Sequence, residues 1–255
     1  MLQILSTKPL SAKENMDMDA LLLESIDRSL DPILRFHSWK SPSFTYGYFT
    51  PFDQYISSVE EMQKRGIDSA KRPTGGGITC HAYDLSFAFL LPSSHRKFSS
   101  DTLENYAFVN TVVKNALMEC FPDAMQLFST KKEGASTKKM APPSPFCMAK
   151  PTKYDVVLEE KDRGKSAGIK KIAGAAQRRK RSGYLHQGTI SIAQPKLDLL
   201  SPDIIPDASI RDAIFFHSYT PLQGNWQEED LQNTRYKLRL LLIQHFRRAL
   251  DNSFE

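Results

Sequence analysis

Hydrophobic and polar positions follow two different periods along the chain, which predicts both strands and helices. Alternating or continuous apolar runs predict strands at 2–6, 33–39, 43–49, 85–92 and 154–160, and a pair within 170–193 around the basic turn RRKRSG. Apolar positions three and four residues apart predict helices at 15–30, within 54–66, after residue 101 and at 227–250. Because these segments follow no regular strand–helix–strand rhythm, we predict an α+β fold with a mixed β-sheet and flanking helices.

Two of the predicted helices have an assignable apolar face. In the helix at 15–30 the face consists of Met18, Leu21, Leu22 and Ile26. The second helix follows DTLE at 101–104, which has the spacing of a capping box. Its predicted buried stripe is Val109, Val112, Val113, Ala116, Leu117 and Cys120. The lysine- and proline-rich stretch 129–145 predicts a loop outside the core.

Length, charge and cysteine usage narrow the class of protein. A chain of 255 residues suits one large domain, and its net charge of +5 favours an acidic partner such as a nucleotide, a nucleic acid or an acidic protein. Cys80, Cys120 and Cys147 form no Cys-x-x-Cys, so we expect neither a disulfide framework nor a metal site. The N-terminus lacks the apolar core of a signal peptide, and no apolar run reaches the roughly 18 residues of a membrane helix. We therefore expect a cytoplasmic protein with no membrane partner.

The segment KRPTGGGITCH at 71–81 contains three of the chain's 12 glycines in succession. It lacks the Lys-Ser/Thr of a phosphate-binding P-loop and the spacing of a dinucleotide fingerprint. On spacing alone, a tight hairpin turn is the favoured interpretation. The flanking Arg72 and His81 support a second one, in which a carboxylate, thioester or phosphate lies against bare backbone.

A second candidate is the segment KIAGAAQRR followed by LHQGTI. Lys171 lies in a predicted strand beside the small residues Ala173 to Ala176, which allow close approach of a ligand or another chain. His186 and Gly188 lie on the returning strand. The alternative is a basic surface hairpin or nucleic-acid patch at 170–181, although the aromatic residues that stack on bases are not interleaved with its basic residues.

Cys147 is the third candidate. Cys120 falls on the predicted buried stripe of its helix, whereas Cys147 belongs to no periodic face and has Lys150 and Lys153 near it in sequence. A thiol close to cations ionises more readily and is a better nucleophile. A lone cysteine is more often a small packing residue, so both interpretations stay open.

Taken in order, these motifs resemble the catalytic domain of the lipoate–protein ligase and octanoyl/lipoyl transferase family, which is related to the biotin protein ligases. The resemblance covers about 15–195 and includes LRFHSWKSPSFTYGYF, the triglycine segment, YDVVLEE, KIAGAAQRR and LHQGTI. It implies a single catalytic domain over 1–255, of the class II aminoacyl-tRNA synthetase and biotin-synthetase type. Residues from about 196 to 255 would form a C-terminal helical extension.

The resemblance also implies roles for individual residues. Lys171 would contact the acyl carbonyl, Arg72 would hold the phosphate or carrier end, and the glycines would line an acyl tunnel with aromatic residues such as Phe36, Tyr46 and Phe87. The segment CMAKPTKYDVV is similar to that of the cysteine-dependent transferases, which would make Cys147 a nucleophile. The expected catalytic residues are Lys171 and Cys147, and the expected substrate-binding residues are Arg72, Gly75, Gly76, Gly77, His81, Gly174, His186 and Gly188.

Two activities follow from the resemblance. A transferase would carry an octanoyl or lipoyl group as a Cys147 thioester from an acyl carrier protein to a lysine of a lipoyl domain or glycine-cleavage H protein, without a cofactor. A ligase would instead use lipoate with ATP and Mg²⁺ and form lipoyl-AMP. The triglycine is the commoner form among ligases, and the family's aspartate and glutamine are replaced by Ala82 and Thr50. A non-catalytic basic binding module is the third interpretation.

Overall fold

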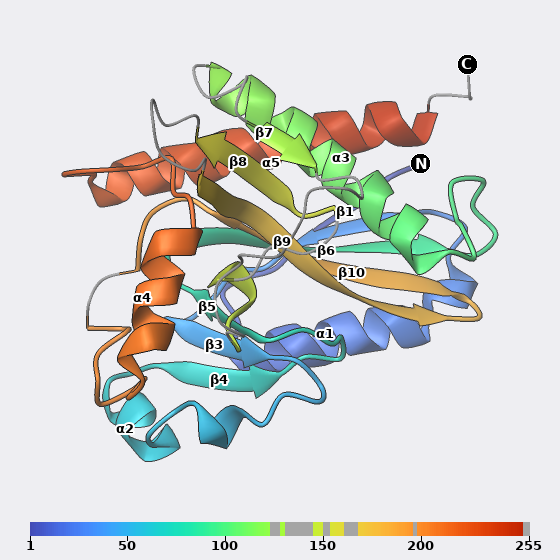
Figure 1. The fold of residues 1–255 in the computed structure, drawn as a ribbon. Coiled ribbons are helices and arrows are strands. Elements are labelled where there is room, and N and C mark those ends of the chain that lie inside the picture. The colour runs from blue at the N-terminus through green and yellow to red at the C-terminus, as the bar shows by residue number, and fades with distance from the viewer. Residues whose placement is uncertain (123–127, 131–144, 150–153, 161–167, 196–197, 252–255) are drawn as a thin grey trace.

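The computed structural model describes residues 1–122, 128–130, 145–149, 154–160, 168–195 and 198–251. Two sheets and five α-helices make up this part of the chain (Figure 1). The strands are β1 (Gln3–Ser6), β2 (Ile33–Phe36), β3 (Ser43–Tyr46), β4 (Asp68–Lys71), β5 (Ile78–His81), β6 (Asp84–Pro92), β7 (Phe128–Thr130), β8 (Val156–Glu160), β9 (Gly168–Lys180) and β10 (Gly183–Ser191). The helices are α1 (Ala12–Glu24), α2 (Val59–Lys64), α3 (Thr102–Cys120), α4 (Ala208–His217) and α5 (Glu228–Asp251).

The large sheet has seven strands in the order β1-β2-β6-β10-β9-β8-β7. Only the β1–β2 pair in it is parallel. In the small sheet, β3 lies between β4, which runs parallel to it, and β5, which runs antiparallel. Both sheets are therefore mixed, as predicted.

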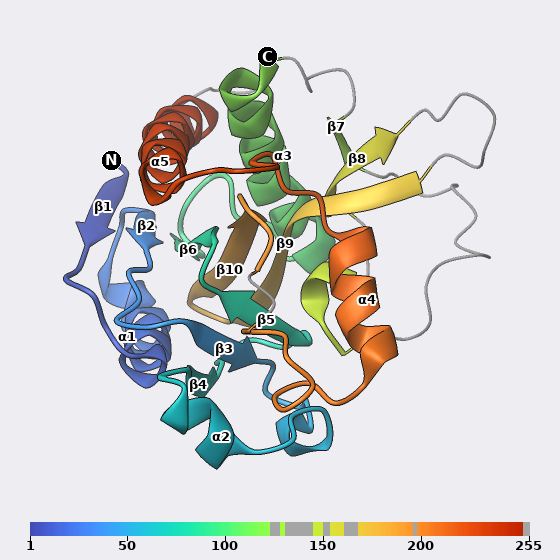
Figure 2. The same cartoon turned by 90° about the vertical axis from the view of Figure 1, so that its left-hand side faces the viewer.

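Helices cover the large sheet on both faces. Figure 2 shows α3 and α5 on one side and α1 with the small sheet on the other. The main core joins α3 and α5 to the sheet through residues such as Val113, Phe89 and Phe246, all at most 1% exposed. A second core under the small sheet includes Phe44, Ile78, Phe146 and Ile214 and is closed by α4. None of the helices in the described ranges combines the length and apolarity needed to cross a bilayer.

Most predicted elements are confirmed to within a few residues. The stripe of α3 is buried as expected, although Asp101 caps the helix through the Leu103 N–H while Glu104 bonds Ser99, so the capping box is incomplete. The sequence patterns did not predict α4, β4 or β5. Residues 129 and 130, predicted as loop, belong to β7, whereas 131–144 lie outside the described residues.

The predicted apolar face of the helix at 15–30 is only partly confirmed. Ile26 is buried and Leu22 packs against the same small core, but Leu21 is 67% exposed. The buried residues of α1 are Ala12, Asn15, Met16, Asp19 and Leu23, two of which are polar. The buried Asp19 carboxylate accepts hydrogen bonds from Arg35 at 2.7 Å and Gln187 at 2.6 Å, and lies 2.8 Å from His37. A polar cluster replaces apolar packing here, and periodicity of apolar residues cannot detect such a face.

The Asp19 cluster makes a prediction about stability and pH. Burial alone would raise the pKa of Asp19, but the contacts with His37 and Arg35 outweigh it and lower the pKa below its ordinary 3.8. Asp19→Asn should therefore lower the free energy of unfolding at neutral pH by about 3 kcal/mol or more, since it leaves the Arg35 guanidinium buried without its counter-ion. Because the unfolded state binds more protons, this contribution is present above pH 3.8 and is lost as the pH falls through the lower folded pKa.

Urea unfolding at neutral pH and at about pH 3 measures this difference. Asp17→Asn is the matched control on the same helix, because Asp17 pairs only with exposed Lys13 and should contribute less than about 1 kcal/mol. Equal effects of the two variants at neutral pH would contradict the prediction.

Candidate active site

The triglycine segment connects two strands that are not neighbours. Residues 72–77 pass from β4 to β5 across the end of β3, so the segment is not the hairpin turn that its spacing favoured. Gly76 has φ +87°, and a Cβ on Gly77 would lie 1.9 Å from the Pro145 carbonyl oxygen. A Cβ on Gly47 would lie 1.8 Å from the Gly76 carbonyl oxygen. Gly47, Gly76 and Gly77 are required here because three backbone segments pack directly against one another.

Cys147 lies against this glycine backbone. Its Sγ accepts the Gly77 N–H at 3.0 Å, and Nη2 of Arg72 is 3.8 Å away. The preceding residues hold the cysteine in place: Ile78 N–H donates to the Pro145 carbonyl at 2.7 Å, and Phe146 is buried in the second core. The sulfur thus faces one backbone donor and one guanidinium, an arrangement that stabilises negative charge on sulfur.

Arg72 is itself held by a buried hydrogen-bonded chain. Its Nη1 donates to Thr45 Oγ1 at 3.0 Å, and its Nη2 donates to the carbonyls of Gly75 and Gly77. The Thr45 hydroxyl in turn lies 2.7 Å from His81 Nε2.

The next contact in this chain fixes the tautomer of His81. The ionised Asp84 carboxylate, 2.8 Å away, can only accept, so His81 carries its proton on Nδ1, and Nε2 of the neutral ring accepts from the Thr45 hydroxyl. Burial lowers the pKa of His81 even though Asp84 opposes this effect, so the ring is neutral at physiological pH. His81 therefore orients its neighbours as a neutral imidazole.

Lys171 lies at an irregularity of β9. Val156 pairs with Ala173 and the next residue, Val157, pairs with Lys171, so β9 has one extra residue at this point. The Lys171 side chain is 4% exposed, and its Nζ lies 2.7 Å from the Asp155 carboxylate and 2.8 Å from the Cys147 carbonyl oxygen. Gly174 leaves room for this side chain, since a Cβ there would be 2.1 Å from Lys171 Cε. The ammonium thus contacts the backbone of the cysteine.

A narrow pocket opens beside the cysteine. Its lining includes Arg72, His81, Cys147, Gly174 and Gly188, together with Met16, His37, Trp39, Thr45, Thr79, Ser86, Ala175, Ala176, Gln187 and Thr189. Several polar side chains in this lining bond to the protein itself. Trp39 donates to Ser86, Thr189 to Asp84, and Gln187 to Asp19. Among the described residues, His37 Nδ1 and Arg72 Nε are buried without a hydrogen-bond partner. The wall can therefore accommodate a mainly apolar ligand that offers a few polar atoms.

The family model of the lipoyl protein ligase A/B catalytic domain matches residues 11–204. The chain belongs to this family. Octanoyltransferase LipM of Staphylococcus aureus is 29% identical over 180 residues, which are 69% of this chain and 60% of that protein. The chain therefore spans less than two thirds of this curated relative's length.

Solved structures of lipoate–protein ligases share the fold. Lipoate-protein ligase A bound with ATP aligns at 22% identity and a TM-score of 0.66, covering 100% of this chain and 86% of the other. A bi-partite lipoate protein ligase of Thermoplasma acidophilum, studied with its E2 lipoyl domain, aligns at 23% identity and a TM-score of 0.63, covering 100% and 84%. The expected α+β fold with a mixed sheet and flanking helices is confirmed.

The structure brings most of the expected lipoyl-ligase-family site residues together. Arg72, His81, Cys147, Gly174 and Gly188 line the pocket, and Gly76 and Gly77 contact the sulfur or its donors. Gly75 contributes its carbonyl to Arg72. Lys171 is absent from the pocket lining. Its side chain passes over Gly174, and its Nζ donates to the Cys147 carbonyl oxygen. In the described part of the chain, no group of three or more His, Cys, Asp or Glu side chains could hold a metal ion.

His186 lies apart from the pocket. Its ring is fully buried, stacks on Phe87 at 6.1 Å and pairs with Gln177 at 2.8 Å. Burial lowers the pKa of His186 to about 3, so it is neutral at physiological pH. Among the aromatic residues expected along a tunnel, Tyr46 stacks on Phe52 and Phe36 lies beneath Arg239, and neither lines the pocket. Phe87 packs over Gly188 instead.

Ala82 and Thr50 stand where the family pattern has an aspartate and a glutamine, and hydrogen bonds near each position serve in their place. Asp84 bonds His81, which Ala82 cannot do. Thr50 Oγ1 donates to the Gly76 carbonyl at 2.7 Å, so it supports the glycine segment from the position where glutamine was expected. Asp155 lies within the matched segments YDVVLEE and CMAKPTKYDVV, but the sequence analysis assigned it no role.

The contact between Gly77 and Pro145 gives a prediction for the glycine segment. Gly77→Ala should displace residues 145–147, lower the free energy of unfolding by about 1–3 kcal/mol and slow alkylation of Cys147 by iodoacetamide. Gly75→Ala is the matched control for stability, because a Cβ there meets no atom within 4 Å. Equal losses of stability in the two variants would contradict the prediction.

Proposed function

We propose that the protein transfers an octanoyl or lipoyl group to a lysine of a lipoyl domain through a thioester on Cys147. The observation that carries this proposal is the position of Cys147 Sγ, 3.0 Å from the Gly77 N–H and beside a narrow pocket. The relation to octanoyltransferase LipM supports the same activity.

The transfer takes place in two steps. In the first, the Cys147 thiolate attacks the carbonyl carbon of an acyl thioester on an acyl carrier protein. A C–Sγ bond forms, the bond to the carrier's sulfur breaks, and the carrier thiolate takes up the proton that Cys147 released. In the second, the neutral ε-amine of the acceptor lysine attacks the Cys147 thioester. The amide bond forms as the C–Sγ bond breaks, and one amine proton goes to Sγ or solvent.

Nearby donors would stabilise the charge that develops in both steps. The Gly77 N–H and Arg72 face the sulfur, and they stabilise the thiolate before attack and when it leaves. Lys171 is buried with its ammonium 2.8 Å from the Cys147 carbonyl oxygen. From there it would supply positive charge to the oxyanion of the tetrahedral intermediate.

The ligase alternative needs a site for the phosphates of ATP. The groups that would bind an adenylate phosphate face Cys147 in this structure: Arg72 points to its sulfur and Lys171 donates to its carbonyl. These contacts support the thioester route, and we derive no step through ATP or Mg²⁺. The solved ligase bound with ATP shares the fold, so the ligase activity remains the alternative outcome of the experiment below.

Acidic proteins are the partners that this proposal requires. The donor would be an acyl carrier protein, or free lipoate in the ligase case, and the acceptor would be a lipoyl domain or a glycine-cleavage H protein. The T. acidophilum ligase studied with its E2 lipoyl domain supports a lipoyl-domain acceptor. Against a nucleic-acid role, Arg178 and Arg179 donate to the protein's own carbonyls at Pro73 and Ser100.

We infer that 1–255 form one catalytic domain, because α5 packs into the same core as α3 and β6. The three cysteines are unpaired thiols, which supports a reducing cytoplasmic location.

Intact-mass spectrometry tests the proposal. Incubated with octanoyl-acyl carrier protein and no ATP, the protein should gain one octanoyl group that hydroxylamine removes. Addition of a lipoyl domain should discharge the adduct and modify the acceptor lysine. Acceptor modification that occurs only with lipoate and ATP would establish the ligase instead, and no modification under either condition would refute both.

A further inference from the structure

A polar face of α3 lies against the residues that hold Lys171. Tyr106 and Asn110 are four residues apart, so they project from the same side of the helix. The Tyr106 hydroxyl has two acceptors within reach, one oxygen of the Asp155 carboxylate at 2.7 Å and the Ala175 carbonyl oxygen at 3.0 Å. The carboxylate is the closer and the stronger acceptor, so the hydroxyl donates to Asp155. The other oxygen of Asp155 lies 2.7 Å from Lys171 Nζ. Both oxygens of this fully buried carboxylate are therefore fixed.

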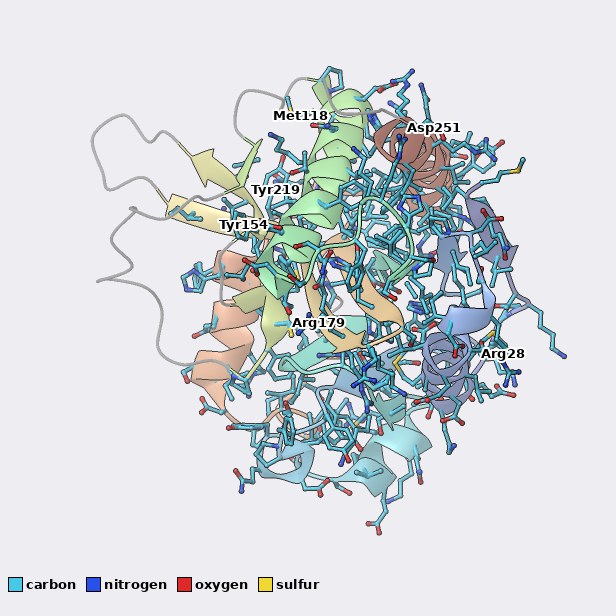
Figure 3. The ribbon with its side chains drawn as sticks, turned by 90° about the vertical axis from the view of Figure 1, so that its right-hand side faces the viewer. Arg28, Met118, Tyr154, Arg179, Tyr219 and Asp251 are labelled. Carbon is cyan, nitrogen blue, oxygen red and sulfur yellow. The ribbon has the colours of Figure 1, made fainter. Side chains whose placement is uncertain are left out.

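The backbone before Asp155 is strained and is held by the same helix. Tyr154 has φ +68°, a conformation that residues other than glycine rarely adopt. Asn110, itself 2% exposed, donates to the Tyr154 carbonyl at 2.9 Å. Figure 3 shows Tyr154 beside α3. Strain of this kind persists only where the surrounding structure enforces it, and it is common at functional sites.

The Tyr106 hydroxyl also connects α3 to the pocket wall. It accepts the Ala175 N–H at 3.1 Å, and Ala175 lines the pocket. Burial and the neighbouring carboxylate of Asp155 raise the pKa of Tyr106 well above its ordinary 10, so the hydroxyl keeps its proton and stays a donor. Neither Tyr106 nor Asp155 is among the pocket-lining residues.

We propose that Tyr106 is a positioning residue that acts through Asp155 to fix the Lys171 ammonium against Cys147. Nothing in the resemblance to known families assigns this role. The effect of Tyr106 on acyl transfer rests on the proposed function. The placement of the Lys171 ammonium does not, because it can be measured without any substrate.

The ¹H–¹⁵N signal of the Lys171 ammonium tests the placement. The signal is assigned by its loss in Lys171→Met. In Tyr106→Phe, we expect its hydrogens to exchange with water at least about fivefold faster than in the wild type, because the carboxylate that holds them is no longer fixed. Tyr184→Phe is the matched control, since Tyr184 is also buried but its hydroxyl has no hydrogen-bond partner in the described structure. An unchanged exchange rate in Tyr106→Phe would overturn the proposal.

Acylation kinetics then test the consequence. Tyr106→Phe should slow formation of the octanoyl adduct about tenfold or more and leave the KM for the donor within about twofold. On a Lys171→Met background the same substitution should have no further effect. An equal loss on both backgrounds would indicate a structural role and overturn the proposal. A wild-type protein that forms no adduct would refute the proposed transferase, while the exchange measurement would still decide the role of Tyr106.

Discussion

Replacing Cys147 by serine is expected to abolish the hydroxylamine-labile octanoyl adduct and to lower the rate of acyl transfer at least about a thousandfold. A serine hydroxyl is not ionised at neutral pH, and the donors around the sulfur, the Gly77 N–H and Arg72, do not supply a base. The substitution changes one atom in a partly exposed loop, so the fold should persist. Intact-mass spectrometry after incubation with octanoyl-acyl carrier protein measures the result.

Cys80→Ser is the control for this prediction. Cys80 pairs with Phe44 in the small sheet, and burial raises the pKa of its thiol, so it stays protonated. The Cys80 variant should still form the adduct. Retention of the adduct in Cys147→Ser, or its loss in Cys80→Ser alone, would show that the wrong cysteine has been assigned.

Lys171→Met should have the second largest effect, a loss of about a hundredfold to a thousandfold in acyl transfer. Methionine retains most of the side-chain volume over Gly174 and removes the charge. The loss follows because the Lys171 ammonium is held against the Cys147 backbone, with Nζ 2.8 Å from its carbonyl oxygen. Steady-state and single-turnover transfer assays measure it.

The stability of this variant needs its own control, because Lys171→Met leaves the buried Asp155 without its ion-pair partner. That loss should cost several kcal/mol in the free energy of unfolding. The double variant with Asp155→Asn removes the unpaired charge and should regain much of the stability without regaining activity. Recovery of activity in the double variant would contradict an electrostatic role for Lys171.

Local patterns were sufficient to predict most of the secondary structure. The stripe of α3, the long apolar run of β6 and the β9–β10 pair follow from periods that a single element imposes on its own residues. The helix α1 shows where this fails. Its buried face includes the polar Asn15 and Asp19, whose partner Arg35 lies on another element.

The candidate site was only partly predictable. The triglycine, Cys147 and Lys171 could be selected because each breaks the surrounding pattern or matches a family motif. Asp155 lies in two matched segments, but nothing in them indicates its partner, and Tyr106 could not be selected because a tyrosine on a helix is an ordinary feature. Tyr106 and Asp155 are 49 residues apart in sequence, and their hydrogen bond forms only because α3 packs against the start of β8.

The sequence by itself determined most of the elements, the fold class and the residues to which we assign the proposed acyl chemistry. Only the tertiary structure decided that the Cys147 sulfur meets the Gly77 N–H, that Lys171 reaches the cysteine backbone, and that His186 packs inside the core. The physical reason is that side-chain periodicity is set by neighbours within one turn or one pleat. Contacts between residues 70 positions apart depend on strand order and on backbones that approach closely only where glycine permits it.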